Sequence, residues 1–440
     1  MKRISSDNLS RASWLILAAL YLYQLVLIYK YSVDVPFKDE WVYLKPGHPL
    51  CLPENLNLGW LFTRISEHTI VMTNLLTWIN FKLFGLDYFK QKIINYIIFG
   101  ILLLAIIRLK NRVIGSSRFR MFPVFLFFLL SPIAVENHSW AFQSQIHLVL
   151  LFFVLMLISM KSESLAAVET LLFLSVAILA IYSFAAGVIL ASICLIFRNL
   201  HLVSLIATKK IGKRAGLLNA AICTIIIGGI IALWFADYKK PDYIPPGIWP
   251  TEPAFWDYYL NLLSYGFGFD SQSLLPGAFI LIISILPLCL FQTDKTKRHD
   301  PDVLCISTAI IAVLTVLASI SFGRASIGDA KTSRYAEISF MLIPFLSMAW
   351  WLLLKNSPAK NLVLPLLWIS CFCSYLDNWA PNLYLETYRS DTSTLGCISD
   401  YYKFGGDAVC QEYWITPAHL EMAKKLRINF TRQAQSAIQP

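Results

Sequence analysis

Long apolar stretches recur along most of the chain, separated by short basic loops or by longer loops of mixed composition. A helix that crosses a bilayer needs roughly 17 to 25 mostly apolar residues, and about eleven windows approach that length. Because only helices and closed barrels satisfy every backbone group in lipid, the pattern predicts an all-α membrane protein. The predicted spans are residues 14–29, 90–107, 121–135, 146–160, 165–182, 184–197, 215–235, 274–291, 303–321, 335–354 and 361–375.

Two of these windows, 165–182 and 184–197, are short and meet at Ser183, where two alanines and Gly187 follow. The pair is therefore either two complete crossings or one re-entrant hairpin. The first window follows three basic residues, as a signal peptide does, but no small-x-small cleavage site precedes Lys30. We expect it to remain as an uncleaved anchor.

The orientation follows from the distribution of lysine and arginine, which gather in cytoplasmic loops. One alternating set of loops is basic, and the other set is longer and holds most of the acids. This predicts a cytoplasmic amino terminus and a carboxyl terminus on the opposite, outer side of the membrane, which is the periplasmic side if the membrane is a bacterial inner membrane. The basic set comprises Lys2, Arg3, Arg11, Arg108, Lys110, Arg112, Arg118, Arg120, Lys209, Lys210, Lys213, Arg214, Lys295, Lys297 and Arg298.

Composition agrees with a chain whose solvent is the bilayer. Hydrophobic residues make up 57% of the sequence and charged residues only 15%, which does not suit a soluble protein of this length. The formal net charge of +10 is explained by the basic loops that set the topology. The expected partner is the lipid bilayer, and nucleic acid is not expected as a partner.

The loops of the acidic set define the outer face. We divide the chain into a membrane domain, residues 1–376, and an outer carboxyl-terminal tail, residues 377–440. The first outer loop covers residues 30–89. Within it, residues 69–84 mix apolar side chains with Asn74, Asn80 and Lys82, which predicts an amphipathic helix lying in the membrane interface.

The first chemical candidate is the acidic segment Val33-Asp-Val-Pro-Phe-Lys-Asp-Glu-Trp41, directly outside the first span. A carboxylate at this depth, Asp39 or Glu40, can act as general base on a hydroxyl beside the membrane, a step that contributes roughly 10² to 10⁴ in rate. The alternative is a solvated acidic cluster that only follows the topology.

Three other outer segments hold candidate binding residues. Outer cations run against the positive-inside bias, and an arginine grips a phosphate with two parallel hydrogen bonds. Each segment also has a plainer interpretation: a helix start, lipid headgroup binding, or an interfacial aromatic belt. The candidates are Arg64 and His68 in the first loop, Gln143 in the 136–145 turn, and Arg324, Lys331, Arg334 and Tyr335 in the 323–335 turn.

Most of the nine cysteines lie in predicted spans, where thiols behave as small apolar side chains. Cys397 and Cys410 lie in the outer tail, and an oxidising compartment favours a disulfide between them. Cys51 is left over. No phosphate-binding loop and no Cys/His zinc spacing occurs, so we expect no required cofactor and no assigned metal ligands, although the carboxylates could hold a divalent ion.

Taken together, these motifs resemble the C-type (GT-C) membrane glycosyltransferases, and more closely a bacterial branch of that family. The resemblance covers nearly the whole chain in the right order, and it includes the paired cysteines of the tail. Thr69 stands where the family has an arginine. The matching motifs are Pro36-Phe-Lys-Asp-Glu-Trp41, Ser66-Glu-His-Thr69, Trp140-Ala-Phe-Gln143, Gly323-Arg324 and Ser333-Arg-Tyr335.

The resemblance implies a GT-C-like bundle that uses a polyprenyl-phosphate-linked sugar as donor on the outer face, with a glycan or glycolipid as acceptor. Asp39 is then the first choice of base and Glu40 the second. By analogy Arg324 and Arg334 hold the leaving phosphate with help from Lys331. Modification of a surface polysaccharide of the O-antigen type, at the bacterial inner membrane, is the expected setting.

Two rival functions fit a similar topology. A transporter or flippase of lipid-linked sugars usually carries ionisable residues near the midplane, and the predicted spans carry almost none. A polysaccharide polymerase or ligase is expected to place its decisive loop later in the chain, without an acidic pair after the first span.

Overall fold

The computed structural model describes residues 6–116, 119, 121–160, 167–236, 238–242, 244–267, 274–294, 297, 300–405, 410 and 415–436. The first two residues of the predicted span 165–182 lie outside these ranges. Several residues of the predicted basic loops lie outside them as well: Lys2, Arg3, Arg118, Arg120, Lys295 and Arg298.

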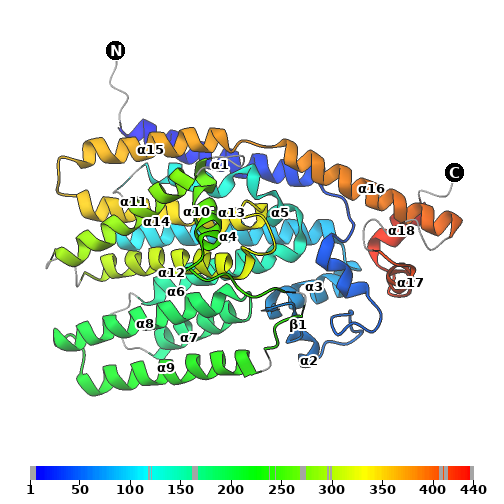
Figure 1. The fold of residues 1–440 in the computed structure, drawn as a ribbon, viewed down its shortest axis with the longest axis horizontal. Coiled ribbons are helices and arrows are strands. Elements are labelled where there is room, and N and C mark those ends of the chain that lie inside the picture. Colours follow the sequence, from blue (N-terminus) through cyan, green and yellow to red (C-terminus); the bar gives the residue numbers. More distant parts are fainter. Residues whose placement is uncertain are drawn as a thin grey trace, which may run out of the picture.

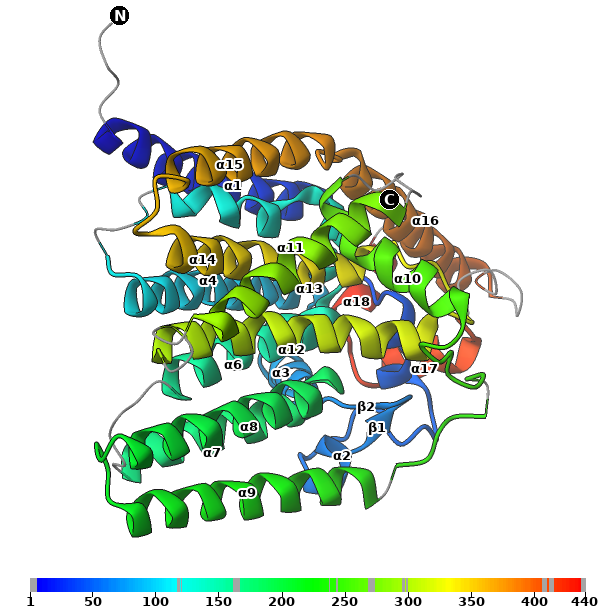
Figure 2. The same ribbon diagram turned by 60° about the vertical axis from the view of Figure 1, so that its left-hand side comes forward.

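Helices dominate the described part, and nine of its helices are long and apolar enough to cross a membrane. This confirms an all-α, multi-pass membrane protein. The spanning helices run side by side along one axis (Figures 1 and 2). They are α1 (Ser6–Tyr31), α4 (Tyr88–Val113), α6 (Ser144–Met160), α8 (Ala186–Ala207), α9 (Lys213–Ala236), α11 (Leu274–Thr293), α12 (Pro301–Arg324), α14 (Leu342–Leu354) with its lead-in from Ser333, and α15 (Lys360–Asp377) with α16 (Asn382–Phe404).

The other two predicted spans take a different form. Residues 121–135 fold into three 3₁₀ segments, η2 (Phe122–Leu126), η3 (Phe128–Leu130) and η4 (Pro132–Ala134). Pro123 and Pro132 lack the backbone N–H that a continuous α-helix needs, and each lies within the first two positions of a short segment. Residues 165–182 contain α7 (Ala167–Ile181), a shorter apolar helix. A count of eleven crossings therefore stays a prediction.

The turn between α7 and α8 is tight. A Cβ atom at Gly187 would overlap the carbonyl oxygen of Ala180, so only glycine fits there. The window predicted to end at residue 197 continues to Ala207 as α8, which makes this helix long enough to span.

The first loop and the tail build a separate layer, named the outer layer after the predicted orientation, at one end of the bundle, on the right in Figure 1. Its hydrophobic core draws on residues 35–88, the 140–142 turn and residues 398–434. The two short strands pair antiparallel, with Ile65 opposite His68. The elements are η1 (Lys38–Leu44), α2 (Leu58–Leu61), β1 (Arg64–Ile65), β2 (His68–Thr69), α3 (Val71–Phe84), α17 (Pro417–Lys425) and α18 (Asn429–Ser436).

Polar contacts fasten the tail to this layer. The carboxylate of Asp34 accepts hydrogen bonds from the Tyr88 N–H at 2.7 Å and from Asn429 Nδ2 at 2.5 Å. Lys92 of α4 forms a buried ion pair with Asp391 of α16 at 3.3 Å. Helix α15 ends at Asp377, close to the predicted domain boundary, but the tail shares its core with the first loop.

Residues 69–84 form a helix, α3, whose polar face is turned into the protein. Asn74 bonds Tyr43 at 2.8 Å, and Asn80 bonds Gln91 at 2.9 Å. The apolar side chains of Ile79 and Leu83 are exposed. That distribution suits contact with lipid, but the position of α3 in the membrane interface stays a prediction.

Candidate functional site

Glu40 joins the first loop to the 140–143 turn. Its side chain is 1% exposed, and its two oxygens accept the N–H groups of Phe37 and Phe142, each at 2.8 Å. Burial raises the pKa of Glu40 to about 8, while the two N–H donors act in the opposite direction. Both oxygens are engaged by the backbone, so this carboxylate fixes the local fold.

Asp39, the next residue back, faces solvent. Desolvation by the surrounding protein nevertheless raises the pKa of Asp39 above its usual value. The positive charges of Arg334, Lys38 and Arg324 oppose that rise without cancelling it. Both arginines come from a turn nearly 300 positions later in the sequence than Asp39. The structure thus brings together the predicted base and the predicted phosphate-binding arginines within electrostatic reach.

The 136–145 turn connects these two segments. Lys38 Nζ lies 2.6 Å from Glu136 Oε1. The backbone N–H of Glu136 donates to Ser333 Oγ at 3.1 Å, in η7 (Ser333–Tyr335). In α5 (Val135–Ser139), Asn137 Nδ2 donates to the carbonyl oxygen of Arg334 at 3.2 Å. Three segments far apart in sequence are therefore fixed to one another around Asp39.

Arg324 is already paired in this structure, because its guanidinium forms an ion pair with Glu67. Glu67 also lies 3.6 Å from His68 Nε2. The His68 ring packs on Phe184, with 4.3 Å between ring centroids. Burial, together with the charges of Arg334 and Arg64, lowers the pKa of His68 to about 3, so the ring is neutral at physiological pH.

Arg64 has a different environment from the other predicted anion-binding residues. Its guanidinium donates to the carbonyl oxygen of Trp234 and lies over that indole ring, 4.4 Å from the centroid. This contact attaches β1 to the end of α9. Arg64 therefore anchors the first loop, while its charge still acts on His68.

A cavity of about 310 Å³ opens beside Lys38 and Glu136. Lys331 lines this cavity and is buried. The other two predicted binding residues, Tyr335 and Gln143, are also buried but do not line it. Glu136 and Trp140 also line it, and Glu136 Oε2 and Trp140 Nε1 have no hydrogen-bond partner among the described residues. The cavity thus offers one buried acceptor and one buried donor beside an aromatic ring.

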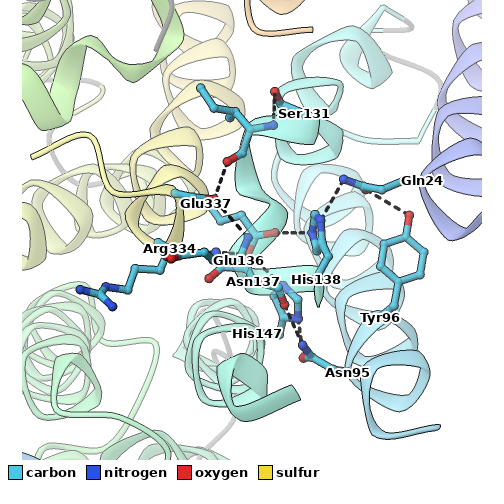
Figure 3. A network of polar contacts seen from close by, with 12 residues as sticks. Gln24, Asn95, Tyr96, Ser131, Glu136, Asn137, His138, His147, Arg334 and Glu337 are labelled. Atoms are coloured by element: carbon cyan, nitrogen blue, oxygen red, sulfur yellow. Dashed lines mark hydrogen bonds and ion pairs between the residues drawn. The ribbon is translucent and has the colours of Figure 1, made fainter. Parts of the chain in front are cut away.

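The sequence interpretation missed a triad of buried side chains, formed by His138, His147 and Glu337. His138 Nε2 lies 2.8 Å from Glu337 Oε1, and His147 Nε2 lies 2.9 Å from Glu337 Oε2 (Figure 3). The scarcity of ionisable residues near the middle of the predicted spans stays a prediction, whereas His147, Glu337 and the buried Lys92 lie near the ends of those spans. The histidine inside the 136–145 motif was the available signal.

No protein-family model, no curated protein and no solved structure matches this chain. The functional interpretation therefore depends on the motifs and on the geometry of the outer site.

Proposed function

We propose that the protein is a membrane glycosyltransferase, which transfers a sugar from a polyprenyl-phosphate carrier to a hydroxyl group of a glycan or glycolipid. The reaction takes place at the outer surface of the bacterial inner membrane and modifies a surface polysaccharide of the O-antigen type. The observation that carries this proposal is a solvent-facing carboxylate, Asp39, under the influence of Arg324 and Arg334 at the end of a membrane bundle.

In the proposed reaction Asp39 removes the proton of the acceptor hydroxyl, and the oxygen attacks the anomeric carbon of the donor sugar. The bond between that carbon and the phosphate oxygen breaks, and polyprenyl phosphate leaves as an anion. A single displacement of this kind inverts the anomeric configuration. Asp39 is preferred to Glu40 as base because both Glu40 oxygens accept backbone N–H groups.

The leaving phosphate needs preorganised positive charge, which Arg324 and Arg334 supply with support from Lys331. To bind the phosphate, Arg324 must leave its ion pair with Glu67 and form one with the phosphate oxygens instead. The pairing with Glu67 compensates the charge of Arg324 before the donor binds.

The acceptor fits the cavity beside Lys38. A sugar hydroxyl can donate to the unpartnered Glu136 Oε2, and another can accept from Trp140 Nε1. The faces of Phe37 and Trp140 suit the apolar side of a pyranose ring. The carrier phosphate provides the leaving group, so the proposed chemistry requires no bound nucleotide.

The test compares surface glycans by mass spectrometry in four strains: a null strain, and strains with the wild type, Asp39→Asn or the control Glu54→Gln, at matched membrane amounts. Glu54 is an exposed acid on the same loop. The proposal expects one sugar residue to be missing in the null strain and in Asp39→Asn only. Normal glycans in Asp39→Asn would remove Asp39 as the base.

A second assay separates the transferase from a flippase or a polymerase. Purified protein in detergent is given a polyprenyl-phosphate sugar and an isolated acceptor glycan, and released polyprenyl phosphate is measured. A flippase releases none, because it breaks no bond. A polymerase or ligase instead attaches many sugar units or a complete polymer, which mass spectrometry of the acceptor detects.

A further inference from the structure

The triad of His138, His147 and Glu337 lies in the interior, where each side chain is 0% exposed. Three separate elements supply it: α5, α6 and α13 (Ala336–Phe340). Figure 3 shows both imidazole rings directed at the Glu337 carboxylate. The candidate ligand atoms of the three side chains all lie within 4.8 Å of one another.

Asn95 decides which nitrogen of His147 carries a hydrogen. Asn95 Nδ2 donates to the carbonyl oxygen of Asn137 at 2.7 Å, so Asn95 Oδ1 is turned toward His147 Nδ1, 2.6 Å away. An N–H must therefore occupy Nδ1. In the neutral ring, Nε2 is left with a lone pair that faces a carboxylate oxygen of Glu337.

Two lone pairs at 2.9 Å repel each other unless a positive charge lies between them. A proton on His147 Nε2 is one possibility, and a metal ion bound by both atoms is the other. A metal ion does not need to lie on the line between the two atoms. It can lie to one side of that line and accept a lone pair from each atom, and the candidate ligand atoms are close enough together for this.

His138 can present Nε2 in the same way. The hydroxyl oxygen of Tyr384 lies 2.9 Å from His138 Nδ1 and can accept its N–H. Gln24, also 2.9 Å from Nδ1, can turn its amide oxygen to the same hydrogen. Histidines that bind metals through Nε2 regularly donate their Nδ1–H to such an outer partner.

We propose that these three side chains bind a divalent first-row transition metal such as Zn²⁺ or Fe²⁺. At metal–ligand distances of about 2.1 Å, atoms 2.8 to 2.9 Å apart subtend roughly 85° at the ion. That angle suits five- or six-coordination with two histidines and one carboxylate. Asn137 Nδ2 donates to Glu337 Oε2 at 3.1 Å and holds the carboxylate in place.

The ion would have a structural consequence for the outer site, whatever reaction takes place there. Asn137 bonds both Glu337 and the carbonyl oxygen of Arg334, and Glu136 precedes it in α5. In Figure 3 the Arg334 side chain points away from the triad. The metal would therefore hold together α5, which carries Glu136, and α13, which directly follows the η7 segment of Arg334, without touching a substrate.

The test measures metal in the purified full-length chain, carrying a histidine-free tag and prepared without chelators from cells grown with added zinc, iron or manganese. Plasma mass spectrometry is expected to find about one transition-metal ion per chain. Glu337→Gln and His147→Gln are expected to lower that content about tenfold. The control His201→Gln removes another buried histidine and is expected to retain the metal.

X-ray absorption on the wild type provides the second measurement, in case the variants do not insert. It is expected to show nitrogen and oxygen ligands at about 2.1 Å with scattering from two imidazoles. A wild-type chain without stoichiometric metal under every growth condition overturns the proposal and leaves a protonated His147 as the bridging charge. Metal that persists in Glu337→Gln and His147→Gln overturns it equally.

Discussion

Lys38 and Glu136 form an ion pair between the first outer loop and α5, with Nζ 2.6 Å from Oε1. The pair holds a positive charge next to Asp39, whose pKa is raised by the surrounding protein and lowered by Lys38. The ion pair therefore affects both the geometry and the protonation of the proposed base.

The first prediction concerns the pH dependence of Lys38→Met. Loss of the charge raises the pKa of Asp39, so the ionised base is lost at a higher pH than in the wild type. The acid limb of kcat/KM for the acceptor should move to higher pH by up to about one unit, and less at high salt. Lys45→Met, an exposed lysine on the same loop, should leave the limb in place. A limb that moves down, or moves equally in both variants, contradicts this.

The second prediction concerns Glu40→Gln. An amide offers one acceptor oxygen, so its NH₂ group meets the N–H of Phe37 or Phe142 in a buried position. We expect a loss of about 1 to 3 kcal/mol in the stability of the outer layer. Hydrogen exchange should show lower protection at residues 37–44 and 140–143 than in the wild type. Unchanged protection there would mean that Glu40 does not join the two segments.

The third prediction concerns the disulfide between Cys397 and Cys410, which are separated by 13 positions. A loop of this size is stabilised by about 3 kcal/mol when it is closed. Cys397→Ser should therefore lower the thermal midpoint of the outer layer, and a reductant should have the same effect on the wild type. Cys51→Ser removes a free thiol and should change neither value. Equal midpoints in Cys397→Ser and Cys51→Ser would contradict the expectation.

The fourth prediction concerns the form of the charge at position 324. Arg324→Lys retains the charge but loses the planar fork that grips two phosphate oxygens. In the proposed reaction kcat/KM for the polyprenyl-phosphate donor should fall about tenfold or more, with the acceptor KM unchanged. Arg389→Lys, an exposed arginine on α16, is the matched control. A full rate in Arg324→Lys would show that a point charge is sufficient.

Much of the fold could be predicted from the sequence, because a long apolar window in lipid has few alternatives to a helix. Nine predicted spans coincide with helices long enough to cross. The segment 121–135 has the same composition but contains Pro123 and Pro132, and it folds into short 3₁₀ turns. Hydrophobicity predicts burial, whereas the backbone donors decide the type of helix.

The site was harder to predict because neighbours in sequence have different surroundings. Asp39 and Glu40 are chemically equivalent in the motif, yet only Glu40 is buried, since Phe142 reaches it from a turn about a hundred positions away. The triad was not visible because His138, His147 and Glu337 follow no recognisable ligand spacing. Their proximity depends on how α5, α6 and α13 pack.

The contact between Asp34 and Asn429 has a consequence for biosynthesis. The ribosome makes the first of these residues almost 400 codons before the second, and the spanning helices that follow α1 are translated between them. The first loop is therefore made long before the residues that cover it. The layer closes only after the carboxyl-terminal segment has been made, so each new chain passes through a period in which the first loop lacks these contacts and is exposed to chaperones and proteases.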